Sequence, residues 1–177
     1  QPTLENAKKV FEGKLFDVYQ WEQEQFDGST EIFEKLKRAD TVCVIPVLPN
    51  GKLILLEDEQ PGREEVLTFP GGRLDPGESP ETAAARELLE ETGYRGELTS
   101  WKALQPVSKV DWALYFFIAR NCEKAQEPHL DAGERIRARE ITLDELFELI
   151  DDPRFVGTDR RKDCSSAKYD PAARKKL

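Results

Sequence analysis

Residues 71–93 constrain the fold of this chain more than any other segment. A serine N-cap at Ser79, a proline at the first helical position and an acid in the first turn predict a helix that begins there. The helix should run to Thr92, because Gly93 follows as a left-handed stop. Residues 71–78 form a glycine-bearing loop that ends in an acid, so this loop must lie beside the start of the helix.

The predicted helix sorts its side chains onto two faces, since each residue turns the helix by roughly 100°. The charged face is expected to carry Arg86, Glu87, Glu90 and Glu91 with Ala83, and the apolar face Ala85, Leu88, Leu89 and Thr92. Acids three and four residues apart are neighbours on a helix. Their carboxylates can therefore share one ligand, and a hard divalent cation such as Mg²⁺ would relieve their repulsion. A solvated surface face is the ordinary alternative for a run of charge.

The spacing of the glycine and the charged residues resembles the Nudix signature in full. Gly72 is followed after five residues by Glu78, and after seven more by Arg-Glu-Leu-Leu-Glu-Glu-Thr-Gly-Tyr at residues 86–94. So many matching positions argue against a merely solvated face. The resemblance implies a Nudix-type α/β/α sandwich that hydrolyses the pyrophosphate bond of a nucleoside diphosphate linked to another group.

The resemblance also implies a role for each residue of the motif. The expected metal ligands are Glu87, Glu90, Glu91 and the backbone carbonyl of Gly71. The expected metal is Mg²⁺, with Mn²⁺ as a substitute. Arg86 and Glu90 are assigned to the catalytic group, and structural roles in the motif fall to Gly72, Glu78 and Gly93.

The catalytic base is expected outside the motif, in the acidic segment 129–136. This segment resembles the acidic loop of the ADP-ribose pyrophosphatase group, and Glu134 is the first candidate within it, followed by Asp131. A single acid in an acidic protein is more often a surface residue. His129, the one histidine of the chain, is a further candidate base, but a lone loop histidine is usually solvent-exposed.

The rest of the chain predicts strands on both sides of this helix. The candidates are residues 14–21, 30–36, 42–48, 52–56, 66–69, 98–104, 113–119 and 136–141. Asn50-Gly51 predicts a strong hairpin between 42–48 and 52–56, and a weaker turn signal at Asp27-Gly28 predicts one between the first two runs. A second helix opens with a capping-box pattern at Thr142 and ends near Pro153. This order predicts an α+β, or mixed α/β, fold.

Three regions are expected along the chain. Residues 1–38 form an N-terminal antiparallel β-hairpin extension, residues 39–160 the Nudix hydrolase domain, and residues 161–177 a polar tail. The extension, followed by 37–42, resembles the ADP-ribose and nucleoside-diphosphate-sugar pyrophosphatases. In that group the extra sheet forms a homodimer interface, so the resemblance implies a homodimer with 1–38 as its dimerisation sheet.

The same resemblance names candidate substrate-binding residues. Arg38 and Arg63 would bind phosphate or base, and Trp21, Phe26 or Trp112 would stack on a purine. Core or interface packing is the ordinary alternative for each aromatic residue. Residues 70–73, Pro-Gly-Gly-Arg, and the early Pro106 depart from the group's pattern, and both departures bear on the sugar.

Charge and composition limit the partners. A net charge of −9 opposes binding to a nucleic-acid backbone. No apolar run reaches the roughly 20 residues of a membrane span, and the three widely spaced cysteines suggest neither disulfides nor a zinc site. A cytoplasmic protein acting on a small nucleotide is expected. The expected reaction converts ADP-ribose to AMP and ribose 5-phosphate. Cleanup of modified nucleoside triphosphates or dinucleoside polyphosphates, and nucleotide sensing without turnover, are the alternatives.

Overall fold

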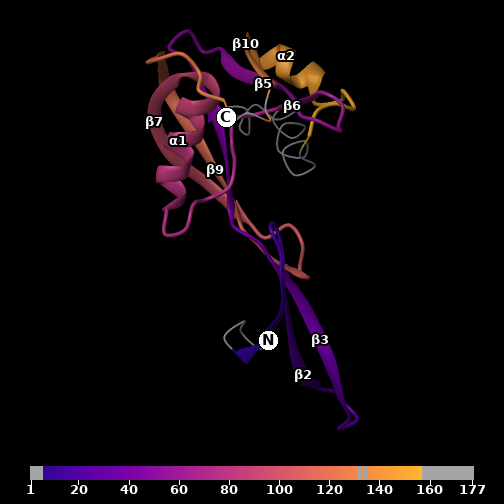
Figure 1. Ribbon diagram of the computed structural model, residues 1–177. Coiled ribbons are helices and arrows are strands. Elements are labelled where there is room, and N and C mark those ends of the chain that lie inside the picture. Colours follow the sequence, from indigo (N-terminus) through magenta and orange to yellow (C-terminus); the bar gives the residue numbers. More distant parts are fainter. Residues whose placement is uncertain (1–5, 131–132, 134, 157–177) are drawn as a thin grey trace.

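A computed structural model describes residues 6–130, 133 and 135–156 of the chain (Figure 1). The elements in chain order are β1 Lys8–Glu12, β2 Asp17–Glu24, β3 Thr30–Lys37, β4 Thr41–Pro46, β5 Leu53–Glu59, β6 Val66–Thr68, α1 Pro80–Thr92, β7 Tyr94–Leu104, β8 Val110–Asp111, β9 Leu114–Lys124, β10 Arg135–Ile141 and α2 Leu143–Leu149. The mixed α/β fold is therefore confirmed. Neither helix in this part of the chain has the length and apolar character that a membrane crossing needs.

The β4 and β5 strands belong to different sheets, so the predicted hairpin is limited to its turn and one antiparallel bridge, between Val47 and Leu53. The tight turn is present, with Gly51 at φ 80° and the Leu48 amide donating to the Lys52 carbonyl. Beyond it, β4 pairs in parallel with β9, whereas β5 pairs antiparallel with β10 and β6. Pro46 ends β4 without an N–H to donate. The edge of β4 away from β9 is bonded to the motif loop, because the Val42 and Val44 amides donate to the Gly72 and Pro70 carbonyls, so β4 has no free edge for β5.

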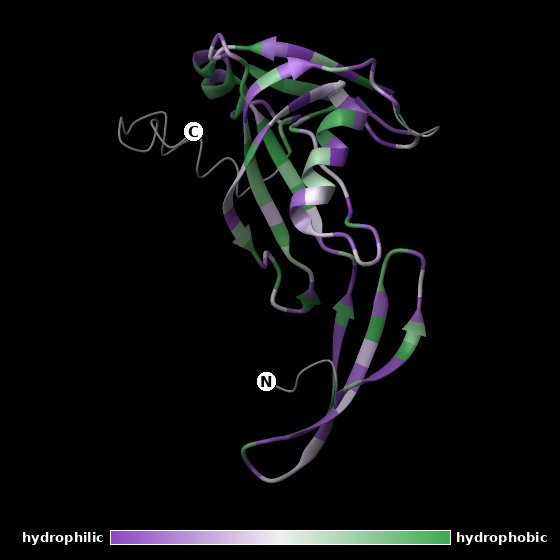
Figure 2. Cartoon of the chain, turned by 90° about the vertical axis from the view of Figure 1, so that its left-hand side faces the viewer, coloured by the Kyte–Doolittle hydropathy of each residue, from purple (hydrophilic) through white to green (hydrophobic). Residues whose placement is uncertain are grey.

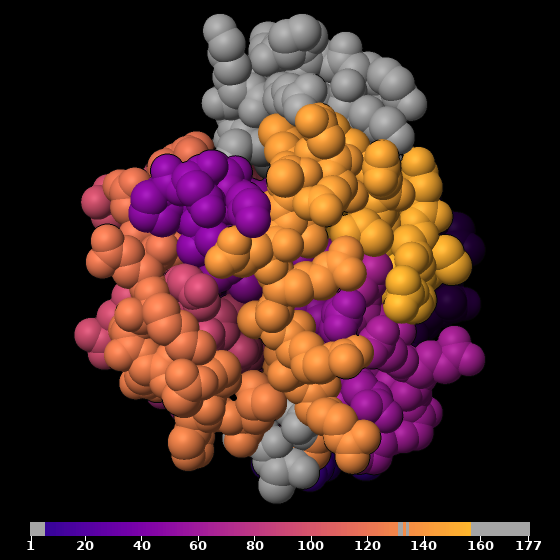
Figure 3. Space-filling view, turned by 90° about the horizontal axis from the view of Figure 1, so that it is seen from above, coloured from indigo at the N-terminus to yellow at the C-terminus, as the bar shows by residue number. Residues whose placement is uncertain are grey.

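Alternate residues of β4 and β5 face two hydrophobic cores. Ile45 and Leu55 belong to a core that includes residues of α2, while Val44 and Ile54 belong to a second core that includes residues of α1. The strands therefore form the middle of the α/β/α sandwich. In the view from above, the orange residues of β10 lie close to the purple residues of the β4–β5 region (Figure 3), in agreement with the pairing of β10 with β5.

The α1 helix has the limits that its capping signals predict. The Ser79 hydroxyl accepts from the Thr82 amide at 3.1 Å, and Gly93 at φ 75° donates its amide to the Leu89 carbonyl at 2.8 Å. The face assignment needs one correction: Ala83 is buried in the core and Ala85 is exposed. The β4 and β7 strands, on which α1 packs, set the buried face, and small alanines at its boundary carry little information about that choice.

The N-terminal region forms a separate narrow sheet that projects from the body (Figures 1 and 2). The predicted β2–β3 hairpin is confirmed, with eight register pairs from Asp17–Lys37 to Glu24–Thr30. Two strands that were not predicted complete this sheet. The β1 strand pairs with β2, and β8 pairs in parallel with the end of β3. Because β8 comes from within residues 39–160, the sheet is not built from the N-terminal region alone.

Candidate active site

The charged face of α1 lines a cavity of about 900 Å³. Motif residues on its wall include Gly71, Gly72, Arg86, Glu87, Glu90 and Glu91, and other segments contribute Arg38, Gln60, Arg63, Arg73 and His129. The cavity therefore has carboxylates from the helix and guanidinium groups from three loops. The structure brings every predicted metal ligand of the motif to this one place.

Arg86 binds the acids of the motif together. Its Nε and Nη2 donate to the two carboxylate oxygens of Glu78 at 3.0 and 2.9 Å. Its Nη1 donates to Glu87 at 2.8 Å and to Glu90 at 3.1 Å. These charge-assisted bonds, first those with Glu78, raise the pKa of Arg86, and the same pair lowers the pKa of Glu78. Arg86 thus orients the box carboxylates, as a positioning residue would.

The two box glycines allow the loop to approach the helix. A Cβ on Gly72 would lie 2.6 Å from Cδ of Glu87, so only glycine leaves room for that side chain. The amide of Gly71 donates to the Glu91 carboxylate at 2.8 Å, and the Val42 amide donates to the Gly72 carbonyl at 2.9 Å. The loop is thereby held between β4 and the acids of α1.

The donor set fits a hard divalent cation in its chemistry, because three carboxylates and the Gly71 backbone line one cavity. Across residues 6–130, 133 and 135–156, however, no three acidic, histidine or cysteine side chains are placed to hold a metal ion together. Glu87 and Glu90 turn to Arg86, and Glu91 turns to the Gly71 amide. A shared ion would draw these carboxylates away from their present partners.

On the basic side of the cavity, the guanidinium group of Arg38 lies over two aromatic rings. The Arg38 guanidinium carbon lies 4.8 Å from the centre of the Trp112 ring and 5.7 Å from that of Phe16. Trp112 is fixed in turn by a 3.0 Å bond from its Nε1 to the Thr41 hydroxyl. Burial and the nearby Arg73 lower the pKa of the Arg38 guanidinium. No acidic partner of Arg38 occurs in the described part of the chain, so an anion from solution can take that place.

Other predicted residues lie elsewhere or outside the described chain. Arg63 and His129 line the cavity, and the His129 backbone amide donates to the Glu90 carbonyl at 2.8 Å. Trp21 lies in β2, packed near Phe33. Phe26 lies fully exposed between β2 and β3. The proposed bases Glu134 and Asp131, and the tail 161–177, lie outside the described residues.

Sequence reasoning missed Arg73 and Gln60, which also line the cavity. Arg73 follows the box glycine directly, so its position inside the motif was a usable signal. Gln60 lies after β5, and nothing local distinguishes it from other polar loop residues.

Comparisons with known proteins agree with this fold and with the resemblance to the Nudix family. Residues 37–160 match the NUDIX domain family. An ADP-ribose pyrophosphatase of Bacillus subtilis (strain 168) is 31% identical over 148 residues, which cover 81% of this chain and 80% of that protein. A methanol dehydrogenase activator of Bacillus methanolicus is 28% identical over 153 residues, covering 84% and 83%. The crystal structure of an ADP compounds hydrolase shares the fold, with a TM-score of 0.77 and 24% identity over 97% of this chain and 95% of that one.

The match to the domain spans more than half of the chain, and the signature residues meet at one cavity. The chain therefore belongs to the Nudix family. Within that family it is a pyrophosphohydrolase, an enzyme that cleaves an acid anhydride.

Proposed function

We propose that this enzyme hydrolyses the pyrophosphate bond of a nucleoside diphosphate sugar, with ADP-ribose as substrate and AMP and ribose 5-phosphate as products. The observation that carries the proposal is the single cavity in which the acids of α1 occur together with Arg38, Arg63 and Arg73. A pyrophosphate diester is anionic, so it needs cationic groups along its length. The 31% identity to an ADP-ribose pyrophosphatase supports the choice of sugar.

The chain's own residues have separable tasks in this reaction. Glu87, Glu90, Glu91 and the Gly71 carbonyl would hold Mg²⁺, or Mn²⁺ in its place. When bound, such an ion neutralises phosphate oxygens and lowers the pKa of an attacking water. Arg38 and Arg63 bind phosphate groups, Arg86 keeps the box acids oriented, and Glu134 is the proposed base that accepts the proton of the water.

The active form is proposed to be a cytoplasmic homodimer joined through residues 1–38. The projecting sheet exposes large apolar side chains, including Val10 (46%), Phe11 (58%) and Ile32 (62%). A thin sheet of this kind buries little by itself, so a second copy is a suitable cover. Trp21 and Phe26 would then reach a nucleotide from the second copy's extension, since neither lines the cavity of its own chain.

The test is product analysis with a substrate panel. The purified enzyme is incubated with Mg²⁺ and ADP-ribose, UDP- and GDP-sugars, a dinucleoside polyphosphate or 8-oxo-dGTP, and the products are separated by chromatography. Glu91→Gln is the inactive variant, and Glu81→Gln is its matched control because Glu81 is an exposed acid in the first turn of the same helix.

Formation of AMP and ribose 5-phosphate, lost in Glu91→Gln and kept in Glu81→Gln, is the expected result. Turnover of another panel member in preference to ADP-ribose would replace the proposed substrate. No metal-dependent turnover of any of them would favour a nucleotide sensor over an enzyme.

A further inference from the structure

The β5 strand places one acid on an otherwise apolar face. Asp58 is only 7% exposed, and it follows Ile54 and Leu56 at alternate positions of the strand. Those two residues belong to the core beneath α1. Burying a carboxylate on such a face is unfavourable unless its oxygens are paired. Packing alone therefore does not explain why an acid occupies position 58.

The pairing of Asp58 is one-sided. Its Oδ2 atom forms an ion pair with Nη2 of Arg63 and accepts a longer bond, 3.5 Å, from Nε2 of Gln60. Its Oδ1 atom is buried and has no hydrogen-bond partner within the described residues. The side chain of Asp58 is 10% exposed and that of Arg63 is 46% exposed. The acid is thus the fixed member of the pair, and the arginine is the member that reaches solvent.

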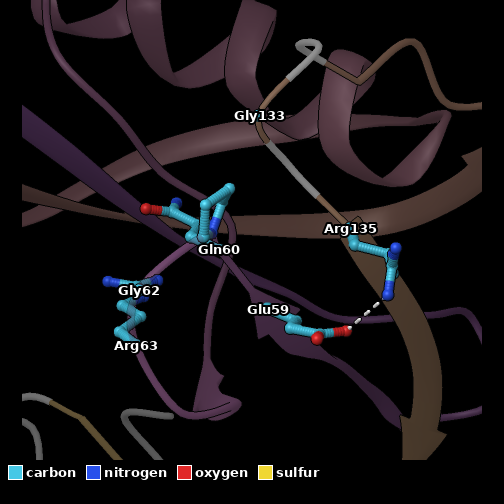
Figure 4. Close-up of a pocket in the computed structure, with 7 residues that line it drawn as sticks. Glu59, Gln60, Gly62, Arg63, Gly133 and Arg135 are labelled. Atoms are coloured by element: carbon cyan, nitrogen blue, oxygen red, sulfur yellow. Dashed lines mark hydrogen bonds and ion pairs between the residues drawn. The ribbon is translucent and has the colours of Figure 1, made fainter.

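Arg63 lies where two cavities meet. Arg63 and Gln60 line both the cavity of the Nudix motif and a smaller pocket of about 290 Å³. Figure 4 shows the smaller pocket, with Gln60, Gly62 and Arg63 on one turn and Gly133 and Arg135 across from it. The turn is tight, because Gly62 has φ 84° and the Arg63 amide donates to the Gln60 carbonyl at 3.2 Å.

The neighbouring acid has a different partner. Glu59 forms an ion pair with Arg135 across the smaller pocket at 3.2 Å (Figure 4). Asp58 is therefore the acid that holds Arg63, and it does so from inside the core. An arginine fixed in this way loses less rotamer freedom when it binds an anion than an unrestrained surface arginine would.

We propose that Asp58 is a positioning residue, which holds Arg63 at the boundary of the two cavities so that Arg63 can bind a phosphate group of the substrate. The identity of the bound group rests on the proposed function. The contact between Asp58 and Arg63 is independent of that function. A purely structural role predicts that an apolar residue at position 58 harms the fold. A positioning role predicts little loss of stability, because Arg63 is half-exposed and its charge stays solvated when Asp58 is replaced.

The first measurement tests the contact without any substrate. Phenylglyoxal modifies accessible arginines, and peptide mass spectrometry gives the labelling rate at Arg63. Asp58→Asn should label at Arg63 about threefold faster than the unchanged chain, because a half-exposed ion pair gives modest protection. Glu57→Gln is the matched control, since Glu57 also pairs with arginines, from the adjacent position of the same strand. An unchanged rate in Asp58→Asn would overturn the proposal.

The second measurement separates positioning from folding. With ADP-ribose and Mg²⁺, Asp58→Asn and Asp58→Leu should raise KM about tenfold and change kcat by less than about twofold, because a binding contact is lost. The melting temperature of Asp58→Leu should equal or exceed that of the unchanged chain, because leucine removes a buried carboxylate with an unpaired oxygen and leaves the Arg63 charge in contact with solvent. A lower melting temperature with unchanged KM would reduce Asp58 to a structural residue and overturn the proposal. If the unchanged chain hydrolyses no panel member, the proposed function fails, and the labelling rates alone decide the role of Asp58.

Discussion

Gly72 lies directly against the side chain of Glu87, so close that a Cβ on the glycine would be 2.6 Å from the Glu87 Cδ atom. The contact joins the loop of the Nudix motif to the acidic face of α1. The position of the Glu87 carboxylate therefore depends on residue 72 having no side chain.

Substitution of the two box glycines should separate catalysis from stability. In Gly72→Ala the new methyl group meets the movable end of Glu87, so the fold should persist while metal affinity and kcat fall about 10- to 100-fold. In Gly71→Ala it meets the Val42 carbonyl and the Cys43 backbone, which cannot move aside, so stability should fall by about 2 kcal/mol. Urea unfolding and steady-state kinetics on both variants check this. Equal losses of stability in the two variants would contradict it.

Removal of Arg86 should have a pH-dependent effect on stability. The pKa of Glu78 is lowered from its usual 4.5, mainly by the Arg86 hydrogen bond. A depressed carboxyl pKa contributes stability above the unfolded value and loses it as the pH falls through the folded value. Arg86→Gln should therefore be about 1 to 2 kcal/mol less stable than the unchanged chain at neutral pH, and the gap should narrow below pH 4.5. Urea unfolding across this pH range measures the gap, and a constant gap would argue against the mechanism.

The aromatic clamp on Arg38 should affect substrate binding more than turnover. Trp112→Leu removes the ring that lies 4.8 Å from the guanidinium, so KM for ADP-ribose should rise about fivefold with little change in kcat. Trp112→Phe keeps a ring and loses only the bond to Thr41, so its KM should stay within about twofold. Steady-state kinetics distinguishes the two variants. An unchanged KM in Trp112→Leu would show that the clamp does not serve binding.

A charge on the projecting sheet should dissociate the proposed homodimer. Ile32 is 62% exposed in β3, and Ile32→Asp would place a carboxylate in an apolar interface. Analytical ultracentrifugation should show a dimer for the unchanged chain and a monomer for this variant. Val156→Asp is the control, because Val156 is also exposed, at 36%, but is bonded to Leu67 in the body of the protein, away from the projecting sheet. A monomeric unchanged chain, or a dimeric Ile32→Asp, would exclude this interface.

The limits of α1 and the charged members of its acidic face follow from sequence alone, whereas the places of Ala83 and Ala85 do not. Capping at Ser79 and Gly93 acts through hydrogen bonds that span only a few residues. The spacing of Arg86, Glu87 and Glu90 likewise brings their side chains together on one helix without help from the rest of the chain. The β2–β3 hairpin is also predictable from local sequence, because the turn signal at Asp27-Gly28 acts over a few residues.

The tertiary structure decided which strands pair and which residues lie across the cavity from the Nudix motif. Asn50-Gly51 correctly predicts a reversal of the chain, but β9 and the loop 70–72 occupy the two edges of β4, so β5 pairs in a different sheet. Arg38 meets Trp112, and Trp112 meets Thr41 across 71 residues, only because β8 and β9 return beside β3 and β4. Contacts of this range depend on which apolar surfaces the whole chain can bury together, and no local signal in the sequence specifies that choice.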